Sequence, residues 1–117
     1  MKETLDKLLL TYDRLIEILE QLSMNAKDQK EKLKGTVVAD ELASDYSDIA
    51  MLYVKLLFEN EWISKEQFLL AQDIDNKLEQ MSQEKSLWNE NALSNAMEWE
   101  DCRIKAKKLL ETLKKSK

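Results

Sequence analysis

The near absence of glycine and proline is the feature that most restricts how this chain can fold. Its 117 residues include one glycine, Gly35, and no proline. All-β folds need many tight turns, which draw heavily on these two residue types. The hydrophobic fraction of 44% is that of an ordinary globular protein and argues against wholesale disorder. The sequence therefore predicts an all-α fold in a single domain over residues 1–117.

Apolar residues recur every three or four positions, which is the spacing of one face of an α-helix. The first such stripe consists of Leu5, Leu8, Tyr12, Leu15, Leu19 and Leu22. Thr4 is its predicted N-cap, and Gly35 is the residue best suited to the left-handed conformation that ends a helix. We therefore expect a first helix over about 4–33.

A second helix is expected over about 36–58, with Thr36 as its N-cap. Its predicted apolar stripe is Leu42, Tyr46, Ile49, Tyr53 and Leu56, flanked by Ala50, Val54 and Leu57. The clearest helix start in the chain follows it. The sequence Ser-Lys-Glu-Gln that begins at Ser64 is a capping box, in which Ser64 and Gln67 satisfy each other's backbone amides.

The end of this third helix is harder to place, because no glycine or proline separates it from the fourth. Ser86 and Asn91 are both candidate N-caps of a fourth helix that runs to about residue 113. One continuous helix over 64–113 is the alternative, but the Trp-Asn-Glu-Asn sequence from Trp88 favours a break. Amphipathic helices joined by short links predict an antiparallel up-down bundle of about four helices.

Composition removes most catalytic chemistry. The chain contains no histidine, and hence no histidine acid–base catalyst or histidine-ligated metal site. Its single cysteine, Cys102, has neither a disulfide partner nor a histidine to activate it, and is best interpreted as a small buried residue. We therefore expect a protein that is not an enzyme, with no catalytic residues, metal or cofactor.

The net charge of −5 is distributed unevenly. The segment 36–84 contains 3 lysines against 11 acidic residues, whereas 1–35 is neutral and 85–117 carries +3. Within the acidic segment, Glu41, Asp45 and Asp48 follow one another at spacings of four and three and form one ridge on a helix. A surface of one sign attracts partners of the opposite sign and speeds their association.

We predict six partner-binding residues: Glu41, Asp45, Asp48, Glu59, Glu61 and Trp62. Trp62 is included because it lies outside the apolar stripes and tryptophan often anchors protein interfaces. The expected partner is a basic protein. Nucleic acid is not expected, because the lysine-rich C-terminal turn lacks interleaved aromatic residues. This pattern favours a non-enzymatic protein–protein interaction module, for example an acidic immunity or inhibitor protein that masks a nuclease toxin.

Two alternatives stay open. The pairs Glu17/Glu20 and Asp45/Asp48 place carboxylates at i and i+3 on neighbouring helices. In this respect the chain loosely resembles the MazG-type nucleotide pyrophosphohydrolases, and the resemblance implies an all-α enzyme that holds magnesium through these four residues. The other alternative is a phage or chaperone-like subunit that assembles through its first helix as a homo-oligomer.

The sequence also bears on location. No stretch approaches the roughly 18 consecutive apolar residues of a membrane span. Asp13 and Arg14 interrupt the short apolar run near the N-terminus, so no signal-peptide core forms. We therefore expect a cytoplasmic protein that does not bind membranes, and its many Asn, Gln and Lys residues favour a bacterial or phage source.

Overall fold

The structure, a computed structural model, describes residues 4–116. Over this range the chain is helical, without strands, and the predicted all-α class is confirmed. The α-helices are α1 (Leu5–Ser23), α2 (Ala26–Lys32), α3 (Val38–Ser44), α4 (Met51–Glu59), α5 (Lys65–Ser82), α6 (Glu90–Asn95) and α7 (Met97–Ser116). A π turn, η1 (Asp45–Ala50), joins α3 to α4, and a short 3-10 helix, η2 (Lys85–Leu87), precedes α6.

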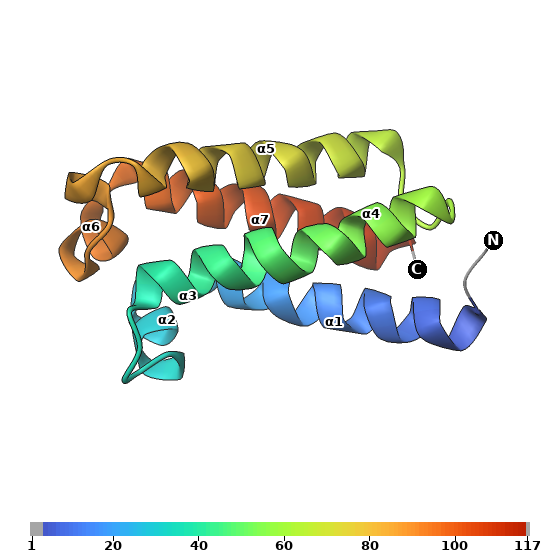
Figure 1. Cartoon of the computed structure of the whole chain (residues 1–117), viewed down its shortest axis with the longest axis horizontal. Coiled ribbons are helices and arrows are strands. Elements are labelled where there is room, and N and C mark those ends of the chain that lie inside the picture. Colours follow the sequence, from blue (N-terminus) through green and yellow to red (C-terminus); the bar gives the residue numbers. More distant parts are fainter. Residues whose placement is uncertain (1–3, 117) are drawn as a thin grey trace.

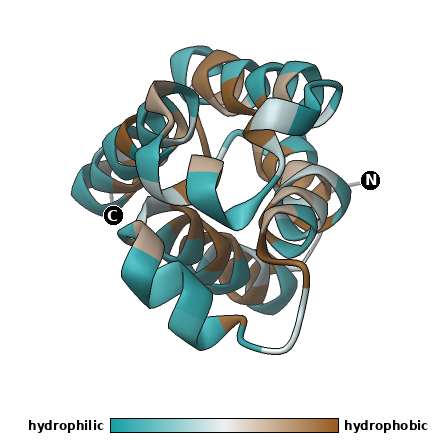
Figure 2. Cartoon of the chain, turned by 90° about the vertical axis from the view of Figure 1, so that its left-hand side faces the viewer, coloured by the Kyte–Doolittle hydropathy of each residue, from teal (hydrophilic) through white to brown (hydrophobic). Residues whose placement is uncertain are grey.

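The long helical stretches lie side by side along a molecule of 44 × 25 × 24 Å (Figure 1). Helix α1 packs on α4 and α7, and α5 packs on the same two helices from the other side. Helices α3 and α4 continue one another through η1, and we refer to them together as the 38–59 helix. The short α2 and α6 cover one end of the molecule, which Figure 2 views directly.

The prediction of about four helices is wrong in number, because the first and fourth expected helices are each broken. Thr4 caps α1 as predicted, since its hydroxyl accepts a hydrogen bond from the Lys7 amide. The chain leaves helical geometry at Met24, however, and Asn25 caps a separate α2. Gly35, at φ +90°, has the predicted left-handed conformation.

The predicted caps of the second and fourth helices are also wrong. Val37 precedes α3 without a side-chain cap, while the Thr36 hydroxyl donates to the Leu33 carbonyl. The expected break between the third and fourth helices is present, but Asn89 caps α6 instead of Ser86 or Asn91. A further break follows at Ala96, which has an extended backbone.

A buried polar network closes the end of the bundle that carries α2 and α6. Gln29 is fully buried and donates to the free carbonyls of Gln21 and Leu22 at the end of α1. Arg103 of α7 donates to the Gln29 side chain and to the Leu93 carbonyl at the end of α6. The network thereby satisfies helix ends that would otherwise bury unpaired carbonyls.

The π turn corrects the predicted core of the 38–59 helix. A π turn closes i→i+5 hydrogen bonds and so adds one residue to a helix, which rotates the downstream face by about 100°. Leu42 and Tyr46 are buried as predicted, but beyond the turn the core residues are Ala50, Val54 and Leu57. Of the residues predicted there, Ile49 is 40% exposed, and Tyr53 and Leu56 are only partly buried.

This register can be tested by truncating one residue from each face. Leu57→Ala should destabilise the protein by about 2–5 kcal/mol, because it opens a cavity in the core. Ile49→Ala should change the free energy of unfolding by only about 0.5 kcal/mol, as is usual for a surface site. Urea denaturation measures both, and equal losses, or a larger loss for Ile49→Ala, would contradict the register that the π turn imposes.

The capping box at the start of α5 is present in full. The Gln67 amide donates to the Ser64 hydroxyl at 3.1 Å, and the Ser64 amide donates to the Gln67 side chain at 2.8 Å. Just beyond it, Phe68 stacks on Phe58 of α4 with ring centroids 4.5 Å apart, which fixes the α4–α5 link. The predicted helix start at Ser64 is therefore confirmed.

Replacing Ser64 with Ala should lower the free energy of unfolding by about 1 kcal/mol, the usual loss for an N-cap. Ser86→Ala is the matched control, because Ser86 is exposed and lies in a short 3-10 helix that it does not cap. Thermal and urea denaturation measure both variants. If Ser64→Ala behaves like the control, the capping box contributes nothing to stability.

Candidate functional site

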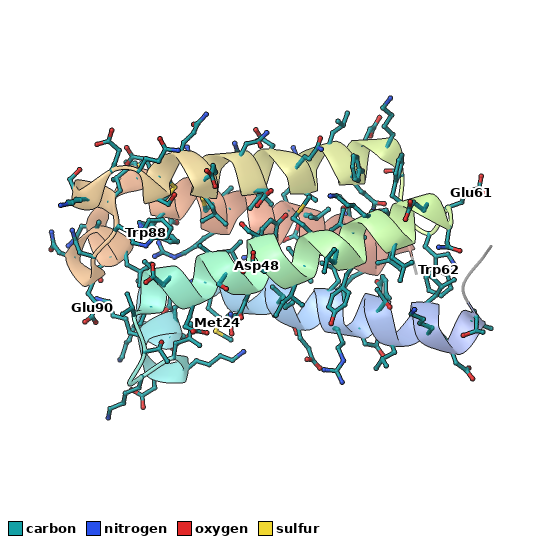
Figure 3. All side chains as sticks on the ribbon, viewed as in Figure 1. Met24, Asp48, Glu61, Trp62, Trp88 and Glu90 are labelled. Carbon is teal, nitrogen blue, oxygen red and sulfur yellow. The ribbon has the colours of Figure 1, made fainter. Side chains whose placement is uncertain are left out.

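The acidic ridge consists of Glu41, Asp45 and Asp48, which lie together on α3 and the π turn. Asp48 is exposed, near the middle of the 38–59 helix (Figure 3), while Glu41 and Asp45 are half-buried. The Asp45 carboxylate accepts a hydrogen bond of 2.8 Å from the Gln21 side chain of α1. The Asp48 carboxylate accepts one of 3.0 Å from the Ser44 hydroxyl. Neutral donors therefore hold two of the three carboxylates in place.

None of the ion pairs among the described residues includes a carboxylate of the acidic ridge. Two of them join α5 to α7: Lys105 lies 2.7 Å from Asp73, and Lys77 lies 3.6 Å from Asp101. Another two are Arg103–Glu100 and Lys114–Glu20. An amide or a hydroxyl fixes a carboxylate without cancelling its charge, so the ridge keeps its negative field.

Asp75 belongs to the acidic segment 36–84 but is not among the six predicted partner-binding residues, and the structure places its carboxylate on α5 against the π turn. Its carboxylate accepts a hydrogen bond of 2.6 Å from the Ser47 hydroxyl of the π turn. Asp75 lies 27 positions beyond Asp48 in the sequence, so helical spacing alone could not place the two together. No local sequence signal places Asp75 beside Ser47, because the contact is between residues of two different helices.

The other three predicted partner-binding residues, Glu59, Glu61 and Trp62, lie toward the opposite end of the 38–59 helix. Glu59 follows Glu41 by 18 positions, which is about 27 Å along a helix. Glu61 and Trp62 lie in the link beyond it (Figure 3). The structure thus splits the predicted set into an acidic ridge and a distal group of Glu59, Glu61 and Trp62.

Within the distal group, Glu61 and Trp62 form the C-terminal cap of α4. The Glu61 amide donates to the Phe58 carbonyl, and the Trp62 amide donates to the Leu57 carbonyl at 2.8 Å. This pair of bonds is a Schellman motif, in which the first residue beyond the C-cap has a left-handed conformation. Glu61 fills that position with φ 62°. Local backbone geometry accounts for where these two residues lie.

The two other tryptophans meet near the opposite end of the molecule. The Trp88 indole donates to Asp40 at the start of α3, and its ring lies 5.4 Å from that of Trp99. Trp99 is fully buried, and its indole donates to the Leu87 carbonyl. Trp88 therefore covers the end of the core and ties the start of α3 to the segment before α6.

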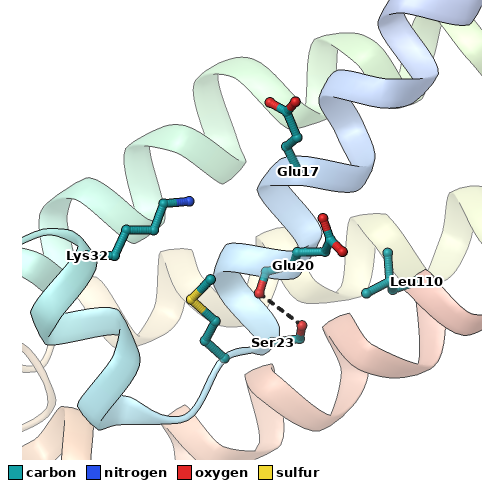
Figure 4. Close-up of a pocket in the computed structure, with 6 residues that line it drawn as sticks. Glu17, Glu20, Ser23, Lys32 and Leu110 are labelled. Carbon is teal, nitrogen blue, oxygen red and sulfur yellow. Dashed lines mark hydrogen bonds between the residues drawn. The ribbon is translucent and has the colours of Figure 1, made fainter.

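The carboxylate pairs that suggested a magnesium enzyme do not converge. Glu17 and Glu20 line an open groove of about 520 Å³ beside Lys32 and Leu110 (Figure 4), and Glu20 is ion-paired with Lys114. Asp45 instead contacts Gln21. Over the described part of the chain, no three Asp, Glu, Cys or His side chains are grouped closely enough to hold a metal ion.

Cys102 is buried as predicted, with its sulfur 3.7 Å from that of Met81. Burial raises the pKa of the Cys102 thiol to about 11, because the thiolate would lose its hydration. The thiolate is the reactive form of cysteine. This side chain is therefore poorly suited to act as a nucleophile.

Comparison of the chain with protein-family models, curated proteins and solved structures found no match. None of the helices between residues 4 and 116 is both long enough and apolar enough to cross a membrane.

We expect Cys102 to react with a thiol reagent at neutral pH only when the protein unfolds. Two causes act together: the side chain is inaccessible, and its pKa is raised, so thiolate is scarce in the folded state. The measurement is the labelling rate with Ellman's reagent in buffer and in increasing urea. Labelling in buffer as fast as in the denatured protein would mean that Cys102 is exposed.

Proposed function

We propose that this chain is a non-enzymatic protein–protein interaction module that binds a basic partner protein through the acidic ridge. The observation that carries the proposal is that Asp45 and Asp48 are positioned by Gln21 and Ser44, which are neutral, and remain outside the ion pairs of the described residues. Like charges at i, i+3 and i+4 spacing destabilise a helix slightly. The hydrogen bond from Gln21 accounts for Asp45 alone, so stability gives no reason to place three like charges together, whereas a basic partner would.

In this proposal the four long helical stretches form an antiparallel bundle that serves as a rigid scaffold. Side chains that are ordered before binding lose less entropy when the partner arrives. The hydrogen bonds to Asp45 and Asp48 provide this order, and Ser47 does the same for Asp75. The distal group of Glu59, Glu61 and Trp62 contributes negative charge and one tryptophan at the far end of the same helix.

An immunity or inhibitor protein that masks a nuclease toxin has the required chemistry. A nuclease surface that binds nucleic acid is basic because it faces phosphates, and an acidic protein can cover it. The composition supports a non-enzymatic role, since the sequence contains no histidine and its only cysteine is buried.

The double variant Asp45→Asn/Asp48→Asn tests the acidic ridge without reshaping it. Asparagine keeps an oxygen that can accept from Gln21 and Ser44, so the fold should be retained while two charges are lost. Association with the partner, captured from an extract of cells that make the protein, should slow by about tenfold at low salt. The difference should shrink as salt rises, because ions screen the remaining field. Stopped-flow mixing measures these rates.

Glu17→Gln/Glu111→Gln is the matched control. It makes the same change in net charge at two exposed positions outside the ridge. Rates close to those of the wild type are expected for it. Equal slowing in both double variants would show that net charge matters and the ridge does not, and no slowing in either would contradict the proposal.

A further inference from the structure

The 38–59 helix carries a second apolar stripe, on its outer side. This outer stripe consists of Ile49, Leu52, Tyr53 and Leu56, at the i, i+3, i+4 and i+7 spacing of a helix face that packs against another element. Ile49 is 40% exposed and Leu52 is 65% exposed, while Tyr53 and Leu56 are partly buried at the edge of the core. The helix thus has one apolar face in the core and another that is exposed at Ile49 and Leu52.

The π turn produces this arrangement. It places Ala50, Val54 and Leu57 in the core, which moves the other apolar stripe outward. Single exposed hydrophobic residues are common on protein surfaces, but apolar residues that follow a helix face over two turns indicate an interaction site.

Acidic residues flank the outer stripe at both ends. Asp45 and Asp48 precede Leu52, Glu59 follows it, and Lys55 is the only basic residue among positions 45–59. An apolar centre bordered by charge is the usual anatomy of a protein interface. The charges here favour an occupant that is apolar along its middle and basic at its ends.

A second copy of this chain does not meet that requirement. If two copies paired antiparallel about Leu52, Asp45 of one helix would lie opposite Glu59 of the other. If they paired in parallel, Asp48 would face Asp48. Both arrangements bring like charges together at an interface, which is unfavourable.

We propose that the outer stripe is the docking site for an amphipathic basic helix of the partner. Apolar side chains of that helix pack on the four residues of the stripe, and its Lys or Arg side chains lie against Asp45, Asp48 and Glu59. Positions 45–59 span about 21 Å, so the docking site accommodates about four turns of helix. This inference rests on the proposed function, because it specifies which element of a basic partner the protein recognises.

The test uses two synthetic peptides of about 15 residues that are identical in composition and charge. One has leucines at i, i+3, i+4 and i+7 with lysines around them, and the other has the same residues in scrambled order. Fluorescence anisotropy of the labelled peptides measures their affinities. We expect the amphipathic peptide to bind about tenfold more tightly than the scrambled one, since only the former can fill the stripe.

Ile49→Ser/Leu52→Ser should weaken binding of the amphipathic peptide by about tenfold, because it removes the exposed apolar contacts. Leu69→Ser is the matched control, since Leu69 is 50% exposed on α5 and lies outside the stripe. It should leave the affinity unchanged. Far-UV circular dichroism establishes that each variant is folded.

Four results would overturn the proposal that the outer stripe is a docking site for an amphipathic basic helix. Equal binding of both peptides, lost in Asp45→Asn/Asp48→Asn, would leave the proposed function intact but show that charge alone attracts the partner. An affinity that Ile49→Ser/Leu52→Ser does not change would place the peptide elsewhere. A wild-type dimer that this variant converts to monomer in sedimentation would make the stripe a self-association surface. Binding of neither peptide would reject an amphipathic helix as the occupant, while partner capture tests the acidic ridge separately.

Discussion

The π turn within the 38–59 helix determines which side of that helix is core. The sequence offers two apolar stripes, and one extra residue in the turn selects between them. Tyr46 occupies the turn, and its fully buried hydroxyl donates to the Ala71 carbonyl at 2.7 Å. A buried phenol needs such a partner. In the observed register Tyr53 stays at the edge of the core, where water can reach it, and Val54 and Leu57 fill the interior without any polar group.

Features encoded within one turn of helix were predictable from the sequence. The capping box at Ser64 depends only on residues three apart, and the stripe of α7 from Trp99 to Leu113 follows a plain α-helical period. The breaks at Met24 and Ala96 were not predictable in this way. No glycine or proline marks them, and they are accompanied by tertiary contacts in which Gln29 and Arg103 satisfy the helix ends that the breaks create.

In the candidate site too, features within one helix were predictable, whereas contacts between helices were not. Glu41, Asp45 and Asp48 do lie on one stretch of helix, but within the π turn Asp45 is directed toward Gln21 of α1 and Asp48 toward the outside. Helical spacing could not supply Gln21 or Asp75, which approach from α1 and α5. Nor could it show that Glu61 belongs to a helix cap, because a left-handed glutamate has no distinctive sequence signal. The six residues predicted as one partner-binding surface therefore lie in two separate places, the acidic ridge and the distal group.

The π turn also connects the fold to the proposed binding surface. Its consecutive side chains point in different directions: Asp45 toward α1, Tyr46 into the core, Ser47 toward α5, and Asp48 to the outside. Asp45, Tyr46 and Ser47 anchor the turn. Each does so through a hydrogen bond to a neighbouring helix, and none of the three partner groups is a cation. Had lysine or arginine supplied the donors, the same packing would have neutralised the surface. Among the described residues, the ion pairs instead lie within α7 or join it to α5 and α1, as Asp73–Lys105 and Glu20–Lys114 do, so they leave the acidic ridge charged.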